Sequence, residues 1–212
     1  MNNIFDNKDG SGIFVQIGAG AGDLDERAGY RDGFTEFIKK LPYERVKKII
    51  LVEPNPINIP FLRKCWKDYP QVEIYQIAIV PKEFKNESVE IFYSLRDSPH
   101  YQVASIIKDH VLIHYNNDES IVKSFKCAAI NINDFLKKYI GSEEIEFISL
   151  DIEGIDSEIV LDINFNTINM KYISFEYIHM GNKLEEVKKH LLDNNFYYIA
   201  DCFNYDYLYK KI

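Results

Sequence analysis

Apolar, β-rich runs recur along this 212-residue chain, and their pattern is the strongest constraint on its fold. Several runs are continuously apolar rather than alternating, as strands are when both faces of their sheet are covered. A mostly parallel sheet with helices on both faces meets this requirement. The predicted core strands are residues 12–17, 46–53, 71–80, 145–152 and 171–177.

Helical patterns fill the gaps between the first three runs. One helix is predicted over residues 34–41 and ends at Pro42. A second is predicted over residues 60–69, with Pro60 in its first turn and Pro70 directly after its end. The alternation of strand and helix predicts a doubly wound α/β fold.

The end of the chain departs from this alternation. Residues 196–200 and 205–209 are strand-like runs that are joined by a few turn-forming residues, which predicts an antiparallel hairpin. A hairpin that closes an otherwise parallel sheet is unusual for NAD-binding domains. The tyrosines of this tail suit either packing within the hairpin or an oligomer surface.

An insertion over residues 81–140 replaces the short crossover expected between the third and fourth core strands. We expect it to lie near the carboxyl edge of the sheet, where such folds bind ligands, and to form the acceptor side of a single domain spanning residues 1–212. Its polar side chains are candidates for lining an acceptor pocket, although their spacing matches no common metal site. These candidates are His100, Tyr101, Ser105, His110 and His114.

A glycine-rich loop, GAGAGD, follows the first predicted strand. It suits a plain tight turn, a phosphate-binding turn or a backbone that approaches another ligand closely. A dinucleotide fingerprint needs a third glycine where this chain has Asp23, and an acid there would repel a phosphate. The G-x-G-x-G pattern of Gly18, Gly20 and Gly22 therefore favours a ligand without a pyrophosphate at this position.

An acid stands at the tip of the second predicted strand, one strand away from the glycine loop. Glu53 precedes Pro54, and Pro56 follows shortly after, so the turn is conformationally restricted. A carboxylate at this place can accept hydrogen bonds from both hydroxyls of a ribose. We therefore predict Glu53 as a ligand of a nucleoside, against the alternative of an exposed strand-end acid.

A second cluster of acids, SLDIEGIDSE, ends the fourth predicted strand. Asp151 and Glu153 are two residues apart, so in a strand they would lie on the same face, at the carboxyl mouth of the sheet. They are predicted as catalytic residues, whereas Asp156 and Glu158 are predicted to serve the N-terminus of the following helix.

His179 follows the fifth predicted strand, close to the same mouth. Its imidazole suits a general base, and Glu176 could hold its tautomer. A carboxylate-bound divalent metal is conceivable here, but the sequence fixes no third ligand, so no metal residues are assigned.

Composition narrows the class of protein. The formal net charge of -8 disfavours nucleic acid as a partner, because its binding rests on clustered Lys and Arg. The three cysteines form no C-x-x-C motif, so neither disulfides nor a structural zinc site are expected. No secretory leader or membrane-spanning run is evident, which predicts a cytoplasmic protein.

The series QIGAGAGD, LVEPNP, YQIAIV, SLDIEGIDSEIV and YISFEYIH resembles the FkbM-type methyltransferases. That family has the class I Rossmann-like methyltransferase fold and uses S-adenosylmethionine. The resemblance implies that Gly18, Gly20 and Gly22 hold the methionine part of the cofactor and that Glu53 binds its ribose. Gln76 and Ala78 would lie beside the adenine.

The resemblance also marks a departure. Gln16 stands where such families carry an acid that organises the amino group of the cofactor, and Asp23 could compensate for the missing charge. The implied function is O-methylation of a hydroxyl on a sugar or another small-molecule acceptor. A nucleotide- or dinucleotide-binding Rossmann enzyme and a non-catalytic cofactor-binding module remain the alternatives.

Overall fold

The computed structural model describes residues 11–23, 32–97, 102–203 and 205–212. Its main sheet has seven strands in the order β10-β11-β9-β8-β1-β2-β3. The strands from β9 to β3 run parallel, and β11 is antiparallel to both β9 and β10. The strand bounds are β1 Gly12–Ile17, β2 Val46–Val52, β3 Val72–Tyr75, β8 Ile145–Leu150, β9 Met170–Glu176, β10 Phe196–Cys202 and β11 Asp206–Lys211.

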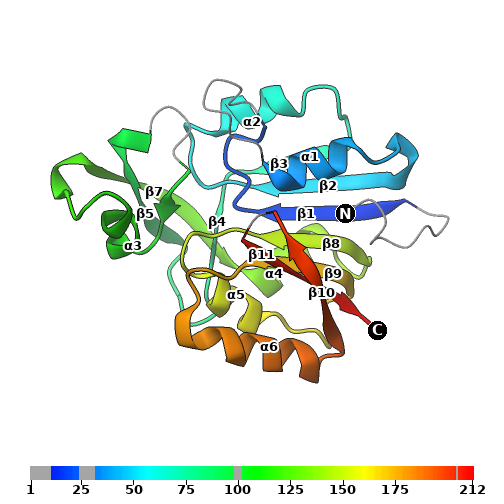
Figure 1. The fold of residues 1–212 in the computed structure, drawn as a ribbon. Coiled ribbons are helices and arrows are strands. Elements are labelled where there is room, and N and C mark those ends of the chain that lie inside the picture. Colours follow the sequence, from blue (N-terminus) through cyan, green and yellow to red (C-terminus); the bar gives the residue numbers. More distant parts are fainter. Residues whose placement is uncertain (1–10, 24–31, 98–101, 204) are drawn as a thin grey trace.

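Helices cover both faces of the sheet, as the sequence predicts (Figure 1). The side chains of β1 alternate between two cores: Val15 packs on the side of α4, α5 and α6, and Phe14 on the side of α1 and α2. Burial on both faces explains why the runs are continuously apolar. The helix bounds are α1 Gly33–Lys39, α2 Ile59–Cys65, α4 Ile132–Tyr139, α5 Asp156–Asp162 and α6 Leu184–Asp193.

The predicted strand over residues 71–80 is in fact two strands in two sheets. After β3, the chain leaves the main sheet at Gln76 and Ile77, and β4 (Ala78–Val80) pairs in parallel with β7 (Val122–Asn131). The apolar run continues through the break because β4 is buried as well: Ala78 and Val80 pack in a separate core. Periodicity alone does not show such a change of sheet.

The insertion builds this second sheet. Its strand order is β4-β7-β5-β6, with β5 (Ser88–Ser94) antiparallel to both β7 and β6 (Ala104–Ser105). The helix α3 (Lys108–His114) packs against β5 and β6. Figure 1 shows this unit to one side of the main sheet, next to α5 and the carboxyl end of β8.

Strand register brings the key loops together. Ile17 at the end of β1 pairs with Val52 of β2 and with Leu150 of β8. The residues that follow these three strand ends, Gly18, Glu53 and Asp151, therefore emerge side by side at one edge of the sheet. Leu150 also pairs with Phe175, and Glu176 pairs with Asp206, so the same edge continues across β9 and β11.

Two further features concern the whole chain. Over the described ranges, no helix has both the length and the apolar character needed to cross a membrane. Cys65, Cys127 and Cys202 are all buried and free.

Candidate active site

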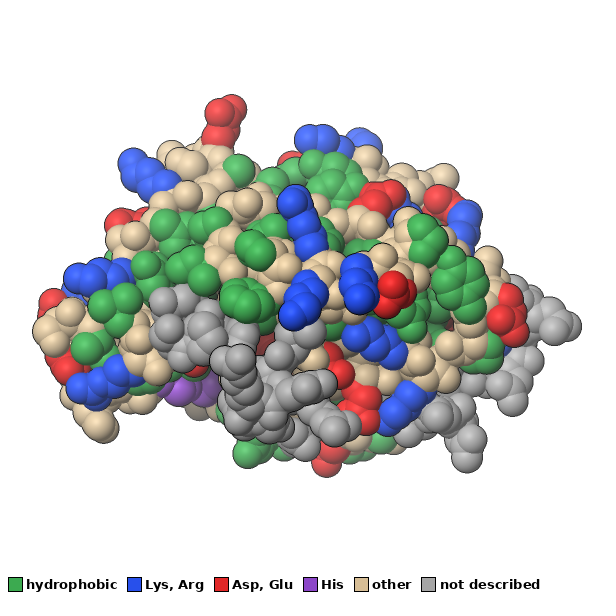
Figure 2. Space-filling model, turned by 90° about the horizontal axis from the view of Figure 1, so that it is seen from above, with side chains coloured by type: hydrophobic (Ala, Val, Ile, Leu, Met, Phe, Trp, Pro, Cys, Tyr) green, Lys and Arg blue, Asp and Glu red, His purple; other side chains and the backbone are tan. Residues whose placement is uncertain are grey.

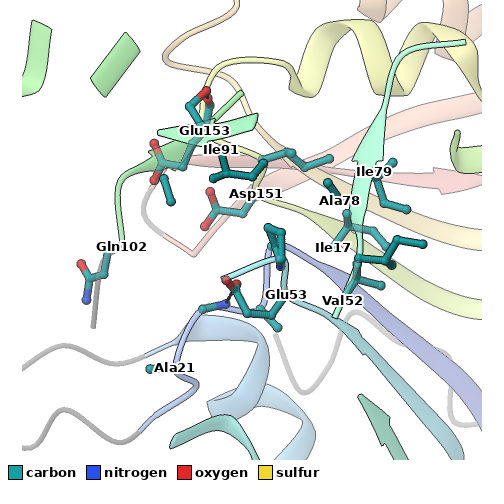
Figure 3. Close-up of a pocket in the computed structure, with 18 of the residues that line it drawn as sticks. Ile17, Ala21, Val52, Glu53, Ala78, Ile79, Ile91, Gln102, Asp151 and Glu153 are labelled. Carbon is teal, nitrogen blue, oxygen red and sulfur yellow. Dashed lines mark hydrogen bonds between the residues drawn. The ribbon is translucent and has the colours of Figure 1, made fainter. Parts of the chain in front are cut away.

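A pocket lies at the carboxyl edge, between the glycine loop and the insertion. Its empty space is about 890 Å³, which includes space open to solvent. Figure 3 shows Asp151 between Glu53 and Glu153, with Ala78 and Ile79 of β4 on one side. This first pocket is lined by residues 17–22, Asp32, 52–54, 77–79, Ile91, Gln102, 104–106 and 151–153.

The three glycines of the loop share a backbone conformation but differ in the space around them. All have positive φ, which favours glycine: 86° at Gly18, 53° at Gly20 and 67° at Gly22. A Cβ on Gly18 would lie 1.7 Å from the carbonyl oxygen of Asp151, and one on Gly22 would lie 2.9 Å from Cys65 Sγ. A Cβ on Gly20 would meet nothing within 4 Å, so this glycine faces open space in the first pocket.

Glu53 is fixed at the base of this pocket and is only 4% exposed. Its Oε2 accepts a 2.8 Å hydrogen bond from the N–H of Gly20, and its Oε1 accepts one of 2.7 Å from the N–H of Asn55. Burial raises the pKa of Glu53 to about 7, although these hydrogen bonds oppose the rise. Oε1 also accepts a longer, 3.4 Å hydrogen bond from Nδ2 of Asn58, whereas Oε2 keeps a second lone pair that can accept a hydroxyl donor.

Gln16 has an acidic partner that the sequence interpretation missed. Its Nε2 donates a 2.9 Å hydrogen bond to Oδ1 of Asp32, while Oδ2 of Asp32 accepts one of 2.7 Å from the N–H of Thr35 and caps α1. Asp32 thus supplies the carboxylate that Gln16 lacks. An acid just before a predicted helix reads as an ordinary N-cap, so the sequence gives no signal for a second role.

The loop after β8 places its acids differently from the prediction. The strand ends at Leu150, so Asp151 and Glu153 do not share a strand face. Glu153 adopts a left-handed φ of 46°, and Gly154 follows with 97°. Asp156 stabilises the turn by accepting a 3.0 Å hydrogen bond from the N–H of Ile152, which agrees with its predicted role at the helix start.

The insertion holds this loop from the other side. Ser105 of β6 donates a 2.7 Å hydrogen bond from Oγ to the carbonyl oxygen of Glu153. Nε2 of His110 on α3 lies 3.0 Å from Oε2 of Glu153, and both side chains are largely buried. The predicted position of the insertion near the carboxyl edge is therefore confirmed, and the insertion itself fixes Glu153.

A second pocket adjoins the first, and four residues line both: Asp32, Gln102, Asp151 and Glu153. Its wall is strongly acidic and also carries aromatic rings. Burial, followed by repulsion from neighbouring acids, raises the pKa of both Glu176 and Asp206 to about 8. The pKa of Asp151 is also raised, again mainly by burial. The second pocket is lined by Gln16, Asp32, Gly33, Phe34, Gln102, Ser149, Asp151, Glu153, Glu176, Phe203, Tyr205 and Asp206.

Three imidazoles meet beside these acids. The rings of His110 and His114 have centroids 4.7 Å apart, and those of His110 and His179 are also 4.7 Å apart. Nε2 of His179 lies 3.7 Å from Oε2 of Glu176. Burial and the neighbouring imidazoles lower the pKa of His179. We name His110, His114 and His179 the imidazole cluster.

Some predicted site residues lie elsewhere. Gln76 is exposed and does not line either pocket, because the chain changes sheets there and turns Ala78 inward instead. Asp23 also lies outside both linings, and its N–H donates to Cys65 Sγ at 3.3 Å. His179 lines neither pocket but adjoins Glu176 of the second. His100 and Tyr101 fall outside the described residues.

The family model of the methyltransferase FkbM domain matches residues 16–198, which begin near the end of β1 and end within β10. The chain belongs to the FkbM methyltransferase family. Its sheet order, with the antiparallel pair β10 and β11 at one edge, is that of the Rossmann-like methyltransferases. No curated protein matches the chain in sequence.

Solved structures share the fold at low sequence identity. The FkbM methyltransferase of Methylobacillus flagellatus KT is 13% identical with a TM-score of 0.51, and the match covers 94% of this chain and 43% of that one. The METTL16 MTase domain is 10% identical with a TM-score of 0.52, and the match covers 100% of this chain and 65% of that one. This FkbM-family chain therefore spans less than half the length of the first relative.

Membership of the family favours S-adenosylmethionine over a dinucleotide as the cofactor, because FkbM methyltransferases depend on S-adenosylmethionine. The first pocket fits this cofactor: it has a glycine loop with an open face at Gly20, an acid at the end of β2 and apolar walls from β4.

Proposed function

We propose that this FkbM-family chain transfers the methyl group of S-adenosylmethionine to a hydroxyl of a sugar or a similar polyhydroxylated small molecule. The observation that carries the proposal is the wall shared by the two pockets, which Asp151 and Glu153 form together with Asp32 and Gln102. With the cofactor in the first pocket and the acceptor in the second, the transferred group would cross at this wall.

The cofactor is oriented from both ends in this proposal. Glu53 would accept hydrogen bonds from its ribose hydroxyls, and Gly18, Gly20 and Gly22 would hold its methionine part. Ala78 and Ile79, which are buried in the wall formed by β4, give an apolar surface for the adenine. Asp32, held by Gln16, offers a carboxylate to the ammonium group, in the role first predicted for Gln16 and Asp23.

The second pocket has the chemistry of a site for hydroxyl groups. Carboxylates such as Glu176 and Asp206 accept hydrogen bonds from hydroxyls when ionised and donate one when protonated. Their raised pKa values keep both forms available near neutral pH. The rings of Phe203 and Tyr205 offer apolar surface for the face of a sugar ring. An acidic wall disfavours nucleic acid.

The reaction needs in-line positioning and a proton acceptor. Bound S-adenosylmethionine would supply its methyl group to the hydroxyl oxygen, with the new C–O bond replacing the C–S bond and S-adenosylhomocysteine as the second product. The hydroxyl proton passes to a neighbouring base. Asp151 and Glu153 both line the two pockets, but Oε2 of Glu153 is engaged by His110 Nε2, so Asp151 is the first candidate and Glu153 and His179 are the further candidates.

Calorimetry with S-adenosylhomocysteine tests the cofactor half of the proposal. We expect micromolar binding to the purified protein, and loss of that binding in Glu53→Ala. Glu73→Ala is the matched control, because Glu73 is an exposed acid of β3 that lies outside both pockets. This variant should bind S-adenosylhomocysteine as the parent does. NAD and a nucleotide sugar serve as parallel ligands, and binding of either in place of S-adenosylhomocysteine would contradict the proposal.

An acceptor screen with methyl-labelled cofactor tests the other half. Mono- and oligosaccharides, glycosides and polyols should include acceptors, and the product should carry the label on oxygen. Amines, peptides and RNA form the comparison set. Methylation confined to that set would overturn the choice of a hydroxyl acceptor while leaving cofactor binding intact.

A further inference from the structure

The imidazole cluster stands apart from the cofactor and at the rim of the proposed acceptor pocket. His110 and His114 are four residues apart on α3, so both project from one face of this helix. His179 reaches them from the loop after β9. One ligand nitrogen from each histidine lies within 4.8 Å of those of the other two.

We propose that His110, His114 and His179 bind a divalent transition-metal ion, and that Glu153, which shares a separate group of close donor atoms with Glu176 and His179, moves to become its carboxylate ligand. Three imidazoles and one carboxylate would form a donor set suited to zinc, cobalt or nickel rather than to magnesium or calcium. Figure 2 shows histidine side chains at the surface on the side of the insertion, where an ion can enter.

The geometry of His110 and Glu153 already fits two ligands of one ion. Their Nε2 and Oε2 atoms are 3.0 Å apart. Two ligands at about 2.0–2.1 Å from zinc lie roughly 3–3.4 Å from each other, so the ion can replace the proton between these atoms with little movement.

His114 is prepared for the same role. Its Nδ1 lies 2.9 Å from the backbone carbonyl oxygen of His110. A carbonyl only accepts, so Nδ1 carries the proton and Nε2 keeps its lone pair. Metal-binding histidines commonly donate their other ring N–H to a backbone carbonyl in this way.

Glu176 adds an independent indication. Its Oε2 is buried and makes no hydrogen bond to any residue that the structure describes, although Nε2 of His179 is 3.7 Å away. Together with Glu153 and His179 it forms a second group of close donor atoms. An ion on His179 would give this carboxylate a positive neighbour.

Only the catalytic role of the metal site depends on the proposed function. An ion beside Asp151 and Glu153 would hold the acceptor oxygen at the wall shared by the two pockets. Glu153 and His179 would then act as ligands, and Asp151 would receive the hydroxyl proton. The binding of the ion itself is independent of the acceptor and can be measured directly.

The test is a zinc titration of the tag-free, full-length protein after removal of metals with a chelator. We expect one equivalent to bind with a dissociation constant of about 1 µM or lower. Cobalt should give the visible absorption of a site with imidazole ligands, and magnesium should not compete. His114→Ala and His179→Ala should each weaken zinc binding by at least about tenfold.

His190→Gln is the matched control, because His190 lies on α6 and contacts Phe165 rather than the imidazole cluster. It should bind zinc as the parent does. His114 is exposed, so its removal should leave the fold intact, which circular dichroism checks. S-adenosylhomocysteine binding is followed in every variant, so failure of the cofactor proposal is recognised separately. Absence of zinc binding, or tight binding that survives both substitutions, would overturn the inference.

Discussion

The backbone N–H of Gly20 donates a 2.8 Å hydrogen bond to Oε2 of Glu53, which joins the glycine loop directly to the end of β2. The loop and the acid are 33 residues apart in the chain, yet each fixes the other. The proposed cofactor site is thereby preorganised, because the loop that would lie beside the cofactor also fixes the acid. Preorganisation lowers the ordering cost of binding.

The open face of Gly20 leads to the first prediction. Gly20→Ala should weaken S-adenosylhomocysteine binding by at least about tenfold, because its methyl group projects into the ligand space. Gly141→Ala is the control, since Gly141 also has positive φ and open surroundings but lies outside both pockets. Both should cost about 1–2 kcal/mol of stability. Equal cofactor affinity in the two variants would contradict the assignment.

Gly18 should behave differently, because the position itself leaves no room for a side chain. A Cβ there would lie 1.7 Å from the Asp151 carbonyl oxygen, so Gly18→Ala must move the loop after β8 or the end of β1. We expect a much larger fall in melting temperature than for Gly20→Ala. Thermal melts of the two proteins, followed by circular dichroism, give the comparison. A fall no larger than that of Gly20→Ala would show that the loops separate easily.

The pKa of Asp206 predicts how stability depends on pH. Burial, with Asp156, Glu176 and Asp32 nearby, raises this pKa to about 8 from an ordinary value of 3.8. The folded state therefore holds a proton that the unfolded state has lost, and the associated stability disappears as pH rises through about 8. Between pH 6 and 9 the loss should be about 2.7 kcal/mol, or roughly 5–11 °C.

Asp206→Asn is the variant that tests this origin. Its side chain cannot ionise, so its melting temperature should fall less over the same pH range than that of the parent. Asp201→Asn is the control, because Asp201 is an exposed acid of β10. Its melting temperature should depend on pH as that of the parent does. Parallel profiles for the parent and Asp206→Asn would assign the pH dependence to other groups.

Asp151 should separate catalysis from binding. Asp151→Asn keeps the shape of the side chain but removes the proton acceptor, so we expect kcat to fall by about 10²–10⁴-fold. Affinity for S-adenosylhomocysteine should change by less than about threefold. Asp134→Asn, on the surface of α4, serves as the control in both assays. Unchanged turnover in Asp151→Asn would remove Asp151 from the mechanism.

The parallel core and its hairpin could be predicted from the sequence because both rest on local patterns. Continuous apolar runs marked β1, β2, β8 and β9, and turn-forming residues marked the connection between β10 and β11. The break between Tyr75 and Ala78 left no such mark, since both sides of it are buried in one core or the other. A change of sheet depends on the partner strand β7, which lies far along the chain.

The site follows the same division. Gly18, Glu53 and Asp151 were predictable because strand ends in a parallel sheet meet at one edge. Asp32 and the imidazole cluster were not, because they depend on contacts across 16 to 69 residues of chain. The prediction that Glu153 shares a strand face with Asp151 was wrong, because the position of Glu153 depends on the turn at Gly154 and on Ser105.

The two-residue passage from β3 to β4 has a consequence for the evolution and engineering of this fold. Ala78 and Ile79 belong at once to the wall of the first pocket and to the sheet of the insertion. An exchange of the insertion between relatives, intended to alter acceptor choice, would therefore also replace part of the cofactor's surroundings if it were cut at Gln76. A chimera joined after Val80 keeps that wall, but its new β7 must still pair with the β4 that is retained. The insertion can therefore be exchanged only together with a compatible pairing of β4 and β7, and not simply at a loop.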